Sequence, residues 1–261
     1  MSTAKRLGAR LCAAVAICLA VLSCNKSPSP DREVQATRLA LGGSSGGTPT
    51  DIHTCAELQA MELDLAGSYR LANDVDCTGF DHGDGGGWKP VGFGGTTFAP
   101  YTGQFDGAGF TITGLGVNRP STHWIGLFGL TFNADVHDVG LVDVNLTGNQ
   151  DVGALIGGAL NTTVSECYAT GTLTGTHEVG GLIGMIKGSL TVVTDSYSAV
   201  AVQGNSTSEG VVIGAALLGA HLQRSYGRST MTHTAAIAGT IDAQSGVNTS
   251  FFDVSAARAP S

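Results

Sequence analysis

The sequence carries little charge: only 13% of its 261 residues are Asp, Glu, Lys or Arg, half the usual share of roughly 25%. The 13 basic residues are outnumbered by 21 acidic ones, and the net charge of −8 argues against binding to nucleic acid. Proline is scarce, with seven residues, and glycine does not recur at every third position, so the sequence excludes a collagen helix. Apolar residues still make up 42%, so the chain is not a disordered polyelectrolyte. The 39 glycines then indicate a turn-rich, all-β protein with a hydrophobic core.

Motifs of nucleotide, redox and zinc chemistry are also missing. The sequence contains no P-loop and no C-x-x-C pair. Its nearest approach to a zinc-peptidase helix is His177-Glu178-Val179-Gly180-Gly181, where Gly181 stands in place of the second histidine. A zinc peptidase is therefore excluded.

No apolar run is suited to span a membrane. Residues 11–21 are too short for a bilayer, which needs about 20 residues, but they follow three basic residues as in a secretory signal. This stretch ends in Val21-Leu22-Ser23-Cys24, which resembles a bacterial lipobox. The resemblance implies cleavage after residue 23 and a lipidated Cys24 that anchors the protein at the bacterial outer membrane or cell surface. The alternative is an ordinary signal peptide that is cut elsewhere.

The composition changes again after Cys24. Residues 24–50 are rich in Ser, Pro and Gly with isolated charges, which predicts a flexible tether. The expected organisation is a lipoprotein signal peptide at 1–23, a lipidated cysteine and tether at 24–50, and one folded domain at 51–261.

Three cysteines remain in the folded domain of an exported protein, where disulfides persist. Thr54 and Glu57 have capping-box spacing ahead of a helical pattern, and the segment that ends at Cys77 alternates like a half-buried strand. A short helix folded back on that strand would bring Cys55 to Cys77, so we predict a disulfide; two separate buried thiols are the alternative. We interpret the remaining Cys167 as a buried core thiol rather than a nucleophile.

The main signal is an internal repeat that starts near residue 124. Each unit opens with an apolar motif that ends in glycine, and these closing glycines are 28, 27, 30 and 25 residues apart. The openings are Ile125-Gly126-Leu127-Phe128-Gly129, Val152-Gly153-Ala154-Leu155-Ile156-Gly157 and Val179-Gly180-Gly181-Leu182-Ile183-Gly184, with weaker copies at 210–214 and 235–239. An aromatic residue follows each of the last four openings after 11 to 13 residues; this aromatic row is Tyr168, Tyr197, Tyr226 and Phe251.

Repeats of this length indicate stacked units that cannot bury their apolar faces alone. The segments are short, rich in Val, Ile, Leu and Thr, and separated by Gly and Asn, which favours strands over helical repeats. One coil of two or three strands per unit makes a parallel β-solenoid. Scarce charge suits such a stack, because like charges on coils about 4.8 Å apart repel one another.

The repeat resembles the GLUG motif, which is named for its Gly-Leu-apolar-Gly core and occurs in bacterial surface proteins. The segment 179–184, followed by Asp195-Ser196-Tyr197-Ser198, carries the resemblance best, and segments 69–76, 88–92 and 105–112 resemble the N-terminal cap and first coils of such proteins. The resemblance implies an all-β, right-handed parallel β-helix of the pectin-lyase-like kind with a short N-terminal capping helix. It also implies display or binding, since GLUG repeats accompany adhesins and the non-catalytic parts of IgA-cleaving metallopeptidases. Val211 and Ala236 depart from the glycine pair in the last two units.

A cluster of acidic residues around a Gly-rich loop is a weak candidate for a metal site. It consists of Asp74, Asp76, Asp81 and Asp84. Oxygen ligands at short spacing suit Ca²⁺, the one cofactor that the sequence suggests, although the order of an EF-hand is missing. The alternative is that these residues are turn aspartates whose carboxylates cap backbone amides.

A second group occupies equal positions in successive units. Glu166 and Asp195 lie one coil apart, each just before the residue pair that ends in tyrosine, and could act as an acid/base couple on a polysaccharide. Arg224 continues the same row, so a solvated ladder closed by a neutralising arginine is the simpler interpretation.

The aromatic row is the third candidate. If its rings face outward they form a ligand-binding platform on which sugars can stack, and if they face inward they form a core stack. In a solenoid of this kind we favour the core interpretation.

The sequence favours a surface-tethered, non-enzymatic β-solenoid lipoprotein that acts in adhesion, matrix binding or envelope assembly. Its expected partners are the membrane, through the lipid anchor, and a protein or polysaccharide of the envelope, with no nucleic acid. The alternatives are a polysaccharide lyase or glycoside hydrolase on the same scaffold, and a structural subunit of an envelope complex. No catalytic residue is predicted.

Overall fold

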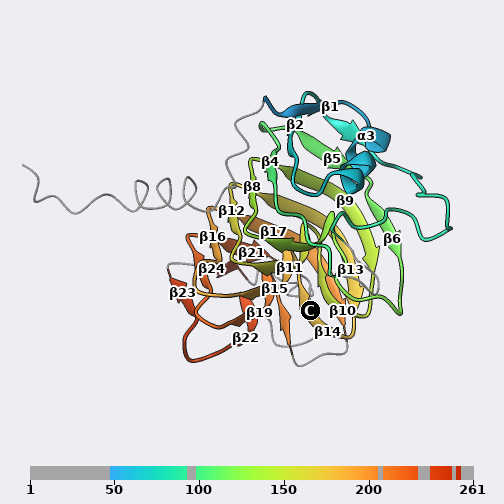
Figure 1. Cartoon of the computed structure of the whole chain (residues 1–261). Coiled ribbons are helices and arrows are strands. Elements are labelled where there is room, and N and C mark those ends of the chain that lie inside the picture. The colour runs from blue at the N-terminus through green and yellow to red at the C-terminus, as the bar shows by residue number, and fades with distance from the viewer. Residues whose placement is uncertain (1–47, 93–97, 205–207, 229–235, 249–250, 254–261) are drawn as a thin grey trace, which may run out of the picture. The chain divides into compact units, whose positions relative to one another are not determined.

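The strands of this protein pair in parallel with the strands one turn away along the chain, which makes the fold a parallel β-helix (Figure 1). The computed structural model describes residues 48–92, 98–204, 208–228, 236–248 and 251–253. The predicted signal peptide, the lipidation of Cys24 and most of the tether fall outside these residues, as does the side chain of Phe251. In the part that is described, no helix is long and apolar enough to cross a membrane.

The first long sheet, sheet A, contains eight strands. In spatial order they are β1 (Thr50–Ile52), β2 (Ser68–Leu71), β4 (Gln104–Asp106), β8 (Asp135–His137), β12 (Thr163–Ser165), β16 (Val192–Thr194), β20 (His221–Gln223) and β23 (Gly246–Asn248). From β4 onward the register aligns the middle residue of each strand with its neighbours, so Val136, Val164 and Val193 form one buried column. Each such side chain stabilises the fold by roughly 1.5–3 kcal/mol through burial.

The second long sheet, sheet B, also has eight strands and contains the longest ones. They are β24 (Phe251–Asp253), β21 (Tyr226–Arg228), β17 (Tyr197–Gly204), β13 (Tyr168–Gly175), β9 (Gly140–Thr147), β5 (Thr111–Thr113) and β3 (Val75–Asp76), with β6 (Gly116–Asn118) paired to the other end of β9. The eight-residue strands β9, β13 and β17 make the broadest part of this sheet.

The third side of the helix is formed by sheet C and the short sheet D. Sheet C consists of β7 (Phe128–Phe132), β11 (Ile156–Leu160), β15 (Ile183–Lys187), β19 (Ile213–Leu217) and β22 (Ala238–Ile241), and sheet D of β10 (Gln150–Gly153), β14 (His177–Gly180) and β18 (Glu209–Gly210). From β7 onward the chain visits sheets C, A and B in each of five turns. The predicted all-β parallel β-helix is therefore confirmed.

A short helix covers the N-terminal end of the core. Helix α3 (Cys55–Ala60) continues into the 3₁₀ turn η1 (Met61–Leu63). The Thr54 hydroxyl accepts a hydrogen bond from the backbone N–H of Glu57 at 3.2 Å, which satisfies one of the free donors at the helix start. Leu58 and Met61 are completely buried over the first turns, so the helix shields core that would otherwise be exposed.

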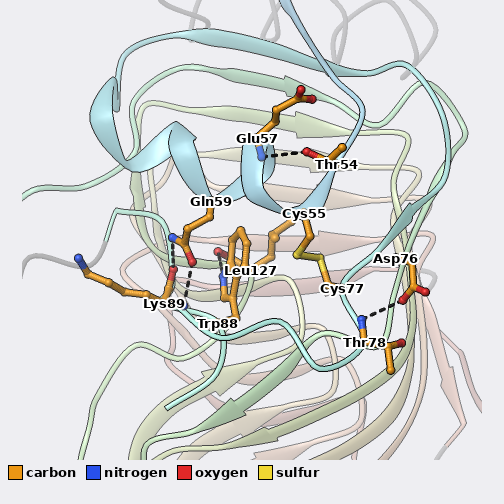
Figure 2. Close-up of a disulfide and its surroundings, with 10 residues drawn as sticks. All are labelled: Thr54, Cys55, Glu57, Gln59, Asp76, Cys77, Thr78, Trp88, Lys89 and Leu127. Atoms are coloured by element: carbon orange, nitrogen blue, oxygen red, sulfur yellow. Dashed lines mark hydrogen bonds between the residues drawn. A yellow bond between two sulfur atoms is a disulfide. The ribbon is translucent and has the colours of Figure 1, made fainter. Parts of the chain in front are cut away.

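A disulfide joins this helix to the end of a strand of sheet B, as predicted from the sequence. Cys55 at the start of α3 is bonded to Cys77, directly after β3, with their Cα atoms 5.3 Å apart (Figure 2). The buried Gln59 amide exchanges two hydrogen bonds with the backbone of Lys89, which holds the same helix against the loop ahead of β4. Cys167 is a buried thiol, as predicted.

The glycines of the repeat allow the turns to approach closely. A Cβ on Gly180 would lie 2.0 Å from the carbonyl oxygen of Ile183 and 2.4 Å from the amide nitrogen of Gly214 in the next turn. A Cβ on the closing Gly184 would lie 2.5 Å from the carbonyl carbon of Asp151 in the preceding turn. Real Cβ atoms do not approach backbone atoms so closely, so only glycine fits at these positions.

The residue directly before each of Tyr168, Tyr197 and Tyr226 points into the core. Cys167, Ser196 and Ser225 are 0–1% exposed. The Ser196 hydroxyl accepts a hydrogen bond from the Cys167 backbone N–H, and the Ser225 hydroxyl accepts one from the Ser196 N–H. These hydroxyls satisfy backbone amides at the corner between sheets A and B.

Candidate functional site

The described part of the aromatic row lies on the outer face of sheet B, with one ring per turn. The ring centroids of Tyr168 and Tyr197 are 5.0 Å apart and those of Tyr197 and Tyr226 are 5.1 Å apart, with interplanar angles of 3° and 9°. Tyr226 is 51% exposed and the other two rings are half-buried. The core interpretation is therefore wrong, because the inward turn of Cys167, Ser196 and Ser225 directs the next residue outward.

This stacking decides what the tyrosines can bind. Near-parallel rings 5 Å apart cover one another's faces, so Tyr197 has a tyrosine on both faces. Tyr168 stacks on Tyr197 and lies against Gly140 of the preceding turn, so both residues present edges and hydroxyls rather than flat platforms. Partial burial, followed by the neighbouring tyrosines, raises the pKa of the Tyr197 hydroxyl, which therefore stays protonated at neutral pH. The described tyrosines offer a row of hydrogen-bonding groups along the solenoid and no platform for sugar stacking between the rings.

The acidic row ahead of the tyrosines lies at the corner between sheets A and B. Glu166, Asp195 and Arg224 have φ angles of 57°, 51° and 46°, which mark equivalent left-handed corners in three turns. Both carboxylate oxygens of Asp195 accept hydrogen bonds from Arg224, at 2.8 Å from Nε and 2.6 Å from Nη2. Asp195 is therefore neutralised within a ladder and poorly suited to be a general base. Such a partly exposed pair stabilises a fold by roughly 0.2–1 kcal/mol.

The four aspartates proposed as weak metal ligands bind protein groups instead. Their carboxylates accept hydrogen bonds from the backbone amides of Thr111 (Asp74), Thr78 (Asp76), Gly85 and Gly87 (Asp81), and Gly86 (Asp84). Asp84 also accepts from Arg119, and this bond, followed by the Gly86 amide, lowers the pKa of Asp84 to about 2. The structure does not bring three of them within ligand distance of one another. Their arrangement fits the interpretation as turn aspartates.

A different group, Asp106, His137 and Asp138, has its donor atoms within 4.8 Å of one another. Those atoms are already engaged: His137 Nδ1 lies 2.8 Å from Asp138, and Asp106 accepts a bond from the Ala108 amide at 2.7 Å. Arg70 also approaches Asp106 to 3.4 Å. We assign no metal to this group, because its charges are compensated by protein groups.

Two acidic residues that sequence reasoning missed lie at the corner ahead of sheet C, where Asp151 is buried and Glu178 is partly buried. Asp151 and Glu178 occupy matching positions in consecutive turns, and each has an oxygen that is buried without a hydrogen-bond partner. Desolvation, followed by the charge of Glu178, raises the pKa of Asp151 to about 7, although a hydrogen bond from Trp124 opposes the shift. A sequence signal existed, since both acids directly precede the valine that opens a repeat.

The outer face of β9, β13 and β17 in sheet B is mostly polar, and Asp143 of β9 is its one exposed charged residue in the described part of these strands. On β13 it presents Thr170, Thr172 and Thr174, while the intervening Leu173 points inward and is completely buried. The register places Asn145 of β9 beside Thr172 and Gln203 of β17 beside Thr174. Amide and hydroxyl groups on a broad, regular sheet can form many hydrogen bonds with an extended partner, so this face is the candidate binding surface.

The fold and this surface define a class, a parallel β-solenoid with a polar outer face. The family model described as the GLUG motif matches residues 148–174, which include β10, β11, β12 and most of β13. A candidate immunoglobulin A1 protease from Bacteroides ovatus, solved by crystallography, has a similar fold, with a TM-score of 0.60 over 81% of this chain and 70% of that chain. Its sequence identity of 19% supports likeness of fold alone.

Curated relatives share more sequence. Halomucin from Haloquadratum walsbyi is 35% identical over 171 residues, which cover 63% of this chain and 2% of halomucin. A candidate Gly-rich membrane protein from Evansella cellulosilytica is 33% identical over 120 residues, or 44% of this chain and 13% of that protein. The chain thus spans only a small part of the length of these relatives.

Proposed function

We propose that this protein is a surface-displayed, non-enzymatic β-solenoid that binds an extracellular matrix polymer through the outer face of sheet B. The observation that carries the proposal is the broad outer face of β9, β13 and β17, where threonine is the commonest outward residue and two tyrosines, Asn145 and Gln203 add further polar groups. Ala199 and Ala201 are the apolar positions of β17 on this face. Polar, uncharged groups at regular spacing suit binding to a repetitive polymer, because each repeat of the ligand meets an equivalent set of donors and acceptors.

The candidate acid/base residues support binding rather than turnover. Asp195 is held by Arg224 through two hydrogen bonds, and a general base needs a carboxylate that can reach a substrate proton. The same pairing is what a structural ladder requires. A polysaccharide lyase or hydrolase on this scaffold would therefore need catalytic groups other than this couple.

The location is proposed from the sequence and from the names of the relatives. The lipobox-like segment ending in Cys24 supports a lipid anchor, and one relative is named halomucin while the other is named a membrane protein. A tether at 24–50 would then hold the solenoid away from the bilayer with the face of sheet B free to meet a matrix polymer.

Binding and turnover are measured on the same samples. The processed full chain is incubated with purified envelope and matrix polysaccharides, bound polymer is quantified, and new reducing ends or unsaturated products are assayed. We expect saturable binding without product, and weaker binding for Thr172→Arg on sheet B but not for Thr240→Arg on the outer face of sheet C. Polymer cleavage that is lost in Glu166→Gln and Asp195→Asn would establish the enzyme instead.

A further inference from the structure

A pocket of about 330 Å³ opens at one end of the outer face of sheet B. One wall is the ends of β6 and β9, which contribute Asn118, Asn145 and Thr147, and the other is the Gly-rich loop at residues 79–87 with Phe80. Ligand pockets in proteins begin at roughly 300 Å³, so this one is large enough for a single small group.

The loop that forms one wall of the pocket is held in place by its own polar groups. The Asp81 carboxylate accepts hydrogen bonds from the backbone amides of Gly85 and Gly87 at 3.1 and 3.0 Å. The Trp88 amide donates to the carbonyl of Gly116 at 2.8 Å, which fixes the end of the loop against β6. The pocket is therefore formed before any ligand arrives, and binding requires little ordering of the loop.

Three polar side chains that line the pocket are uncommitted. In the part of the chain that the structure describes, the side chains of Asn118, Asn145 and Thr147 make no hydrogen bond to protein groups. Asn118 and Thr147 are register partners on neighbouring strands, and Asn145 lies two residues before Thr147 on the same face. Together they offer amide N–H donors, amide oxygen acceptors and a hydroxyl, the combination that pairs with hydroxyl groups acting both as donors and as acceptors.

The remaining wall is aromatic. Phe80 is half-buried, and its ring centroid lies 5.9 Å from that of Trp88, which is completely buried. The Trp88 indole donates to the carbonyl of Leu127 at 3.0 Å, so the aromatic pair is anchored to the core (Figure 2). An apolar ring beside amides and a hydroxyl matches a ligand with an apolar C–H face and a hydroxylated rim.

None of the residues that line the pocket is ionisable. Beside the pocket, Arg119 and Asp84 bind each other at 2.8 Å, and Arg119 also donates to the carbonyl of Trp88. The carboxylate of Asp81 in the loop accepts from two loop amides. A carboxylated or sulfated ligand would therefore find no free cation in the lining to compensate its charge. We infer that this pocket binds one residue of a neutral, hydroxyl-rich glycan; the inference rests on the proposed function and names its ligand class.

The surroundings of the pocket extend the site to a polymer. Thr172 lies beside Asn145 and Thr174 beside Thr147 on the next strand, β13, and Gln203 follows Thr174 on β17. A glycan whose residue sits in the pocket continues along this row, parallel to the axis of the solenoid, and contacts one polar side chain per turn.

The test compares neutral and charged polymers on the full processed chain. Soluble glucan, mannan and galactan are the neutral probes and polygalacturonate is the charged one, with dissociation constants measured at low and moderate salt. We expect saturable, salt-insensitive binding of at least one neutral probe. Asn145→Asp and Asn118→Asp keep the side-chain shape but remove the amide donors, so each weakens that binding about tenfold without moving the melting temperature. Gln244→Ala, an exposed amide in a turn near the other end of the solenoid, is the matched control and leaves binding unchanged.

The outcomes separate this inference from the proposed function. If a neutral polymer still binds both Asn→Asp variants but no longer binds Thr172→Arg, the pocket is not the binding site, while the proposed function of sheet B stands. Preferential binding of polygalacturonate that weakens with salt overturns the ligand class. Absence of binding to every polysaccharide, the envelope and matrix samples included, overturns both.

Discussion

Replacing Gly180 by alanine should open the solenoid between two turns. The added Cβ would lie 2.0 Å from the carbonyl oxygen of Ile183, 2.4 Å from the amide nitrogen of Gly214 and 2.8 Å from the carbonyl carbon of Ile213. All three are backbone atoms, so no side chain can rotate away, and the backbones must separate by on the order of 1 Å to reach an ordinary contact. That movement weakens the parallel pairing of β15 with β19 and of β14 with β18.

We expect Gly180→Ala to cost about 3 kcal/mol, at the upper end of the range for overpacking. For a domain of this size, that cost lowers the melting temperature by roughly 6–12 °C. Calorimetry on Gly180→Ala, Gly126→Ala and Gly116→Ala tests the reasoning, because the closest contact of the added Cβ rises from 2.0 to 2.8 Å and then to none within 4 Å. The destabilisation should fall in the same order. A melting temperature for Gly180→Ala within a degree of the parent protein would refute the argument.

Four further predictions concern individual groups. Replacing both Cys55 and Cys77 by alanine should cost about 3 kcal/mol, measured by urea unfolding, because the bridge closes a loop with a sequence separation of 22. The pKa of Asp151 is about 7 in the folded protein and 3.8 in the unfolded chain, so the folded state loses a few kcal/mol of stability as pH rises between these values. Melting curves should show this dependence in the parent protein and not in Asp151→Asn. Arg224→Gln should lower stability by less than about 1 kcal/mol in the same assay, since its ion pair is partly exposed. Cys24→Ser should abolish incorporation of labelled fatty acid and release the protein from the membrane fraction; unchanged labelling would exclude the proposed anchor.

The repeat made the architecture predictable. Glycines and apolar residues at a near-constant spacing required one coil per unit, and short β-branched segments required strands rather than helices. The disulfide was predictable for a similar reason, because helical spacing after Cys55 and strand parity before Cys77 placed both cysteines on buried faces. These are local patterns, and local patterns survive in the folded protein when every turn repeats them.

The outward direction of the tyrosines was also within reach of the sequence. Cys167 is buried, and neighbouring residues of a strand point to opposite faces, so Tyr168 had to face outward. The core interpretation was wrong because the direction of each ring follows from the buried residue directly before it. What the sequence could not provide is the stacking itself, since the overlap of the rings depends on the distance and twist between adjacent turns.

The pocket could not be predicted, because its two walls come from segments far apart in the chain. Phe80 belongs to a glycine-rich loop, whereas Asn118 and Asn145 lie on strands that follow about 40 and 65 residues later. The loop itself offers only a turn-rich composition, and the carboxylate of Asp81 organises it through bonds to two of its own amides. Sequence patterns do not specify which strand end such a loop will cover.

The closing glycine of the repeat explains where this scaffold can acquire function. Gly157, Gly184 and Gly214 each pack against the corner residue of the preceding turn, which has a left-handed φ. A Cβ on any of these glycines would lie 2.5 Å from a backbone carbon of that corner residue. Those corner residues are Trp124, Asp151 and Glu178. Because the glycine accommodates the corner through its backbone alone, the corner side chain is free to differ between turns. The closing glycines therefore maintain the stack, and side chains at other positions are free to form the polar face of sheet B and the pocket lined by Phe80, Asn118 and Asn145.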